Sequence, residues 1–163
     1  MSAEKPSHVE LPAHGYLADL TVEERGLYAE AGSFVAGDVG DYLCVQGQPN
    51  TAMSIILSGS VSITAHANGE KVDLAVLGEG EVVGEMCVID PGKASATARV
   101  SEPSDLWSIN RDAFETFIHE HPGVGIKIMR GLAKVMCYRV RNDSEKMLRR
   151  ESELGSKFLD RDY

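Results

Sequence analysis

The chain has little cysteine and no long apolar run. Its three cysteines, Cys44, Cys87 and Cys137, are distant from one another in a chain of 163 residues. An odd number of distant cysteines provides neither a disulfide framework nor the closely spaced ligands of a zinc site. No stretch approaches the roughly 20 apolar residues that a membrane-spanning helix needs, and residues 1–8 lack the charged and apolar blocks of a signal peptide. We therefore expect a cytoplasmic protein with no bound metal and no contact with a membrane.

Basic residues are also scarce over the first two thirds of the chain. Residues 1–110 contain five Lys/Arg against sixteen Asp/Glu, whereas residues 111–163 contain eleven against nine. The whole chain carries a formal net charge of −9. A body of this charge repels a phosphate backbone and gains no affinity from counterion release. We therefore expect no nucleic acid among the partners, and any bound anion would need a well-placed local cation.

What is present is typical of one globular domain, with 43% hydrophobic and 25% charged residues. Between residues 34 and 110 the apolar period is two, and short β-branched segments alternate with glycine-rich turns. Asn68-Gly69 is the strongest hairpin signal, and Ser58-Gly59 predicts a further turn between two strands. About eight short strands with this spacing favour a sandwich, a jelly roll or a small barrel.

Helical patterns flank this β region. Residues 17–31 predict a short helix in which Thr21 and Glu24 form a capping box, and residues 112–118 predict another. A long helix is expected over about residues 124–154, some 45 Å at 1.5 Å per residue. Such a helix is longer than a small barrel can cover, so we expect a homodimer formed through it. Its seam, at alternating spacings of three and four, consists of Met129, Ala133, Met136, Val140, Asp143, Met147, Arg150 and Leu154.

An ordered series of glycine-containing motifs runs through the β region. It comprises Gly37-Asp38, residues 45–48, 53–61, 69–70, 77–80 and 83–86, and Ala96-Thr97. In this order the motifs resemble the cyclic nucleotide-binding domain family, whose members include catabolite activator proteins. The resemblance implies a mainly β fold, an eight-stranded jelly-roll β-barrel with an N-terminal helix and a long C-terminal helix. It divides the chain into a flexible N-terminus (1–16), the domain (17–140) and a helix end with a tail (141–163).

The resemblance identifies residues 80–97 as a phosphate-binding cassette. It implies that Gly84 lets the backbone approach a ligand, that Glu85 accepts a hydrogen bond from a ribose hydroxyl, and that amides following Glu85 face a cyclic phosphate. A ligand would then be cAMP or cGMP, and no cofactor is implied. The candidate ligand-binding residues are Val83, Gly84, Glu85, Met86, Cys87, Val88, Lys93, Ala94, Ser95 and Ala96.

One position departs from the family pattern. The family places a phosphate-binding arginine where this chain has Ala94, and the nearest cations are Lys93 and Arg99. Neighbours on a strand point to opposite faces, so neither residue simply replaces an inward-facing arginine at 94. Two interpretations follow. Either a cyclic nucleotide binds weakly through Glu85, Ser95 and a repositioned Lys93, or the site has degenerated and the domain is a protein-interaction or dimerisation scaffold.

Other functions have weaker signals. A cupin enzyme would need inward-facing metal ligands, but the β region has one histidine, His66, and His119 and His121 flank a helix break. Cys87 is more typical of a small core residue than of an oxidant sensor. No nucleophile-elbow, P-loop or dinucleotide motif occurs, so we expect no enzyme. The residues after position 148 are too few for a DNA-binding domain, and the chain is predicted to be a stand-alone regulatory sensor.

Overall fold

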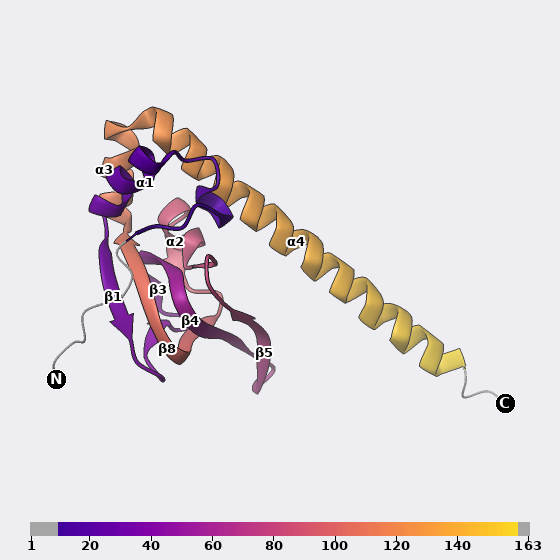
Figure 1. The fold of residues 1–163 in the computed structure, drawn as a ribbon. Helices are drawn as coiled ribbons and strands as arrows, with labels where there is room; N and C mark the ends of the chain where they lie inside the picture. The colour runs from indigo at the N-terminus through magenta and orange to yellow at the C-terminus, as the bar shows by residue number, and fades with distance from the viewer. Residues whose placement is uncertain (1–9, 160–163) are drawn as a thin grey trace.

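The computed structural model describes residues 10–159 (Figure 1). The chain begins with a 3₁₀ turn, a short helix and the first strands, and it ends with two helices. In chain order the elements are η1 (Gly15–Leu17), α1 (Val22–Glu30), β1 (Ser33–Gly37), β2 (Tyr42–Cys44), β3 (Pro49–Asn50), β4 (Ala52–Ala67), β5 (Glu70–Leu77), β6 (Val82–Val83), α2 (Glu85–Ile89), β7 (Gly92–Lys93), β8 (Thr97–Asn110), α3 (Arg111–Glu120) and α4 (Pro122–Leu159).

Two long strands organise the sheet. β4 and β8 pair antiparallel along most of their length, and β1 and β5 extend this pair in the order β1-β8-β4-β5. The short strands β2 and β6 pair with β8 and β4, while β3 and β7 form a separate two-stranded sheet. The expected fold class, mainly β with flanking helices, is confirmed. The strands of the described chain pair in an open sheet and do not close into a complete barrel.

β4 corrects one sequence-based prediction. Residues 52–67 form a single strand, so the predicted turn at Ser58-Gly59 is wrong. Gly59 has a φ of 81°, and the pairing of β4 with β8 changes register around it. A glycine with positive φ occurs in some β-bulges as well as in tight turns, which explains why the sequence signal was misread. A Cβ at Gly59 would lie 2.8 Å from the Cα of Ser104, so a side chain has no room there.

The hairpin and capping-box predictions are confirmed. Asn68 and Gly69 both have positive φ, 54° and 84°, and join β4 to β5 with Ala67 opposite Glu70. At the start of α1, the Thr21 N–H donates to Oε2 of Glu24 at 2.8 Å, and the Glu24 N–H donates back to the Thr21 hydroxyl at 3.3 Å. Both motifs depend on residues within three positions of one another, which makes them readable from sequence.

The main core lies between the sheet, the N-terminal segment and the C-terminal helices. Trp107 of β8 is fully buried, its indole N–H donates to the Ala29 carbonyl at 3.0 Å, and its ring packs on Tyr28. Burial raises the pKa of the hydroxyls of Tyr16 and Tyr28. Leu11 is buried as well, and the boundary at residue 17 stays a prediction. Residues 1–9 of the predicted N-terminus lie outside the described residues.

α4 is attached to the rest of the domain by close packing and ion pairs. Gly131 faces the backbone of Tyr16, and Ile128 and Leu132 beside it are fully buried. The Lys127 Nζ contacts both carboxylate oxygens of Glu24, at 2.7 and 2.8 Å. Lys134 reaches Asp19 at 3.1 Å. Hydrogen bonds from these lysines hold the pKa of each carboxyl below its usual value.

Beyond this attachment α4 projects away from the β-roll (Figure 1). The helix contains 38 residues, more than the predicted 124–154. Along the predicted seam, Met129 and Met136 are partly buried, while Ala133, Val140, Asp143 and Met147 are exposed. The side chains of Arg150 and Leu154 lie outside the described residues. The seam is therefore available to a partner at its exposed positions, and the homodimer stays a prediction. In residues 10–159, no helix combines the length and apolarity needed to cross a membrane.

Candidate functional site

Within the cassette, Gly84 forms a tight connection between β6 and α2. β6 pairs with β4, with Val83 opposite Ser54. Gly84 then adopts a left-handed conformation with a φ of 79°. A Cβ at Gly84 would lie 2.8 Å from the Asn50 amide nitrogen and still closer to the Ala52 carbonyl oxygen. Glycine is therefore required both by the backbone conformation and by lack of space.

Glu85, the first residue of α2, is a buried carboxylate with a cationic partner. Its residue exposure is 5%, and its Oε1 accepts a hydrogen bond from Nη1 of Arg139 at 2.6 Å. Nη2 of Arg139 donates to the Val82 carbonyl at 2.7 Å. Arg139 belongs to α4, so a distant helix contributes a guanidinium to the cassette. A buried carboxylate without such a partner would carry a large desolvation cost.

The other members of the cassette separate into buried and exposed positions. Val83, Cys87 and Val88 are buried, whereas Met86 is 52% exposed. Burial raises the pKa of the nearby Cys44 thiol, whose Sγ donates to the Ala96 carbonyl at 3.6 Å. These thiols occupy packed positions, as expected for cysteine used as a small hydrophobic residue.

The far end of the cassette has no inward-facing cation. Ala94 is buried and is fixed by two backbone hydrogen bonds of 2.9 Å, one with Gln48 and one with Gly47. Lys93 beside it lies on β7 and is exposed, as are Ser95 and Gly92, while Ala96 is partly buried. β7 ends at Lys93, so the chain passes from an exposed lysine to a buried alanine at the end of this short strand.

Arg99 is also turned away from the cassette. Its Nε donates to the Gly40 carbonyl at 2.9 Å, and its guanidinium carbon lies 5.3 Å from the ring centroid of Tyr42. Both contacts are made on the exposed side of β8, where a cation–π contact is weak but orienting. Among the described residues, Arg139 is the cation placed against the cassette carboxylate.

Sequence reasoning missed Arg139. The contact joins residues 54 positions apart, and no local motif marks one arginine on a helix that carries several. Residues on the same face of α4 as Arg139 indicate which side of the helix packs on the domain. Val135 and Asn142 are partly buried like Arg139, so this face packs toward the domain.

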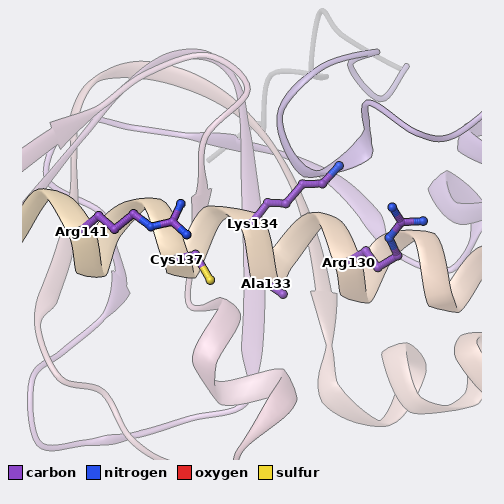
Figure 2. A pocket seen from close by; sticks show the side chains of 5 residues that line it. All are labelled: Arg130, Ala133, Lys134, Cys137 and Arg141. Carbon is purple, nitrogen blue, oxygen red and sulfur yellow. The ribbon is translucent and has the colours of Figure 1, made fainter.

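A second feature of α4 lies on its other side. A shallow hollow is lined by Arg130, Ala133, Lys134, Cys137 and Arg141 (Figure 2). Cys137 and Arg139 are about 200° apart around the helix, so the hollow is separate from the cassette.

The histidines of the described part of the chain do not form a metal site. His66 is exposed at the end of β4, and its backbone N–H donates to the Gln46 side chain at 2.7 Å. The His121 ring packs on Phe117, with centroids 4.9 Å apart. Within residues 10–159, no group of three His, Cys, Asp or Glu is arranged to hold a metal ion.

Comparison with known proteins identifies the domain. The family model described as "Cyclic nucleotide-binding domain" matches residues 38–121. A CRP-like cAMP-activated global transcriptional regulator of Mycobacterium tuberculosis is 29% identical over 96 residues, which are 58% of this chain and 43% of that protein. A lysophospholipase of Candida albicans is 32% identical over 99 residues, 58% of this chain and 7% of that enzyme. The chain therefore spans less than half the length of these curated relatives.

A solved structure shares the architecture. The crystal structure of a cyclic nucleotide-binding domain from Methylobacillus flagellatus is 26% identical and superimposes with a TM-score of 0.77, covering 81% of this chain and 75% of the other. The family model spans more than half of the present chain, and it includes the buried Glu85 and the left-handed Gly84. This chain therefore belongs to the cyclic nucleotide-binding domain family.

Proposed function

We propose that the chain is a non-enzymatic regulatory sensor that binds cAMP or cGMP weakly and signals through α4. The observation that carries this proposal is the contact between Glu85 and Arg139, which joins the cassette carboxylate directly to α4. In the proposal, residues 17–140 form the binding unit and residues 141–163 extend its output helix. The sensor acts in the cytoplasm.

The proposed site uses the residues from Val83 to Val88 and from Lys93 to Ala96. Gly84 lets a ligand approach the backbone, and Glu85 accepts a hydrogen bond from a ribose hydroxyl. Burial of Glu85 strengthens such a bond, because few water molecules compete for the carboxylate. Met86 and Lys93 are exposed and Ala94 is buried, and in the proposal the first two border the site while Ala94 faces its interior.

Weak binding is proposed because the interior lacks a cation at position 94. Loss of one charge-assisted hydrogen-bonded pair to a phosphate costs roughly a hundredfold in affinity. The acidic composition of residues 1–110 adds unfavourable long-range interaction with an anion. Signalling follows if the ligand changes the contacts of Arg139. A ligand that makes more favourable contacts with one orientation of α4 than with another increases the population of the first.

The first prediction concerns ligand binding itself. Isothermal titration of the wild-type chain with millimolar cAMP or cGMP should give measurable heat, and Glu85→Gln should weaken binding at least about tenfold by removing the ionised acceptor. Glu70→Gln, an exposed carboxylate at the start of β5, is the matched control and should bind as the wild type does. Absence of heat with both nucleotides contradicts the proposal.

A scaffold without a nucleotide ligand is the alternative function. Two observations favour it, the partner that Glu85 already has in Arg139 and the alanine at position 94. In this case α4 stays fixed on the cassette, and the domain presents its surface to a protein partner. The same titration separates the two functions, because the scaffold gives no heat with either nucleotide.

We propose further that two copies associate through α4. Val140 and Met147 lie one heptad apart and are each 66% exposed. Exposure of two large apolar side chains on one face of a helix to water is unfavourable, and a second copy of α4 would cover them. Replacing both with aspartate should convert a dimer to a monomer in light scattering. Tyr138→Asp is the control, because Tyr138 is equally exposed (65%) but lies outside the seam. A wild-type monomer, or a dimer that survives the double replacement, excludes this interface.

A further inference from the structure

We infer that Asn50 is a positioning residue for the proposed site, because its carboxamide holds the Gly84 turn that directs Glu85. The inference rests on the proposed function and adds to it a residue outside the cassette. Asn50 lies on β3 and is partly buried. Its Nδ2 donates to the Ala52 carbonyl at 2.9 Å, and its Oδ1 accepts from the Ala52 N–H at 3.3 Å. Because one bond needs a donor and the other an acceptor, the pair fixes the orientation of the carboxamide.

The Gly84 turn depends on its neighbours for its conformation. Gly84 has a φ of 79° where β6 leads into α2, yet glycine populates positive and negative φ about equally. The atoms that face its Cα are the Ala52 carbonyl oxygen and Nδ2 of Asn50, since an added Cβ would lie 2.5 Å and 2.8 Å from them. These are the two atoms that the Asn50 side chain joins by a hydrogen bond. That bond therefore keeps in place the surface on which Gly84 packs, and a rotation at Gly84 would move the carboxylate of Glu85, the next residue.

Asn50 also borders the far end of the cassette. Its backbone pairs with Gly92 in the two-stranded sheet of β3 and β7, and the nearby Gln48 carbonyl accepts from the Ala94 N–H at 2.9 Å. In the proposed site a ligand spans the cassette, with its ribose at Glu85 and its phosphate near position 94. Asn50 thus contacts the Gly84 turn through its side chain and the far end through its backbone, and it sets how the two lie relative to each other.

The alternative is a purely structural role. Asparagine side chains commonly bond to the backbone two residues further along in turns, and such bonds stabilise the connection between β3 and β4 whether or not a ligand binds. The two roles differ in what loss of the carboxamide changes. A structural role lowers the stability of the domain and leaves the ligand affinity of the folded protein unchanged. A positioning role lowers that affinity as well.

The experiment is calorimetric titration of the full chain with cAMP, at a temperature where thermal unfolding shows each variant to be folded. Asn50→Ala should weaken binding about 3- to 10-fold, the contribution typical of one hydrogen bond. Asn50→Ser keeps a hydroxyl that makes the same kind of bond more weakly, and its affinity should lie between those of Asn50→Ala and the wild type.

Asn68→Ala is the matched control. Asn68 follows the opposite end of β4 from Ala52 and has a φ of 54°. Alanine is disfavoured at positive φ, so this variant should be less stable than the wild type and yet bind cAMP with the same affinity.

The outcomes separate the inference from the proposed function. An unchanged affinity of folded Asn50→Ala overturns the inference alone, as does an equal loss of affinity in Asn68→Ala, which would indicate a general effect of lower stability. Absence of cAMP binding by the wild type overturns the proposed function together with the inference. If Asn50→Ala fails to fold, Asn50→Ser decides: weaker binding supports the positioning role, and wild-type affinity contradicts it.

Discussion

An Ala94→Arg variant should bind cAMP roughly a hundredfold more tightly than the wild-type chain. Ala94 is buried, and its neighbour Lys93 is exposed. In the proposed site, position 94 is where the family resemblance places the phosphate-binding arginine. An arginine there would form a charge-assisted, bidentate pair with a phosphate, where water competes little for it.

The same variant should be less stable without ligand. The substitution introduces a buried guanidinium without introducing a carboxylate to pair with it, and an unpaired buried charge destabilises the fold. We expect a lower melting temperature in thermal unfolding and a large recovery when cAMP is added, because ligand binds only the folded state. Lys71→Arg, at an exposed position on β5, is the control and should change neither quantity. A gain in affinity equal in both variants would show that position 94 does not face the ligand.

Gly131→Ala should destabilise the domain by about 2–3 kcal/mol. The added Cβ would overlap the carbonyl oxygen of Tyr16 and lie 2.7 Å from its carbonyl carbon and 2.9 Å from its Cα. All three atoms belong to the backbone, so no side-chain rotation relieves the overlap. Either η1 or α4 must move, and this separates the buried Ile128 and Leu132 from their neighbours. Urea unfolding monitored by tryptophan fluorescence measures the loss.

The control for this substitution lies on the same helix. A Cβ at Gly123 would meet nothing within 4 Å, so Gly123→Ala should be neutral or stabilise by up to about 1 kcal/mol through helix propensity. Equal stabilities of the Gly131→Ala and Gly123→Ala variants would contradict the close approach of α4 to Tyr16.

Local signals in the sequence predicted local structure well. The capping box of Thr21 and the hairpin at Asn68-Gly69 depend on neighbouring residues, and each formed as expected. The prediction failed at Gly59, where the required positive φ is common to a turn and to a bulge. Only pairing with β8 decides between them, and that pairing involves residues more than 40 positions away.

The part of the site that sequence could not reveal is also non-local. The family resemblance pointed to Glu85 and to the alanine at 94, but the partner of Glu85 comes from α4. Which arginine of that helix reaches the cassette depends on the rotation of α4 about its axis, and close packing at Gly131 sets that rotation. A glycine within a helix reads only as a weak helix former, so its role became visible in the structure alone.

The length of α4 has a mechanical consequence. From the contact at Gly131 to its end at Leu159, the helix extends about 42 Å at roughly 1.5 Å per residue. Pivoting there by about 10° would carry the end of the helix through some 7 Å, given that length. Arg139 lies only about 12 Å from the same pivot, by the same rise per residue. A movement of α4 by about 2 Å at the cassette would therefore displace the C-terminal end of the helix by more than the length of one helical turn.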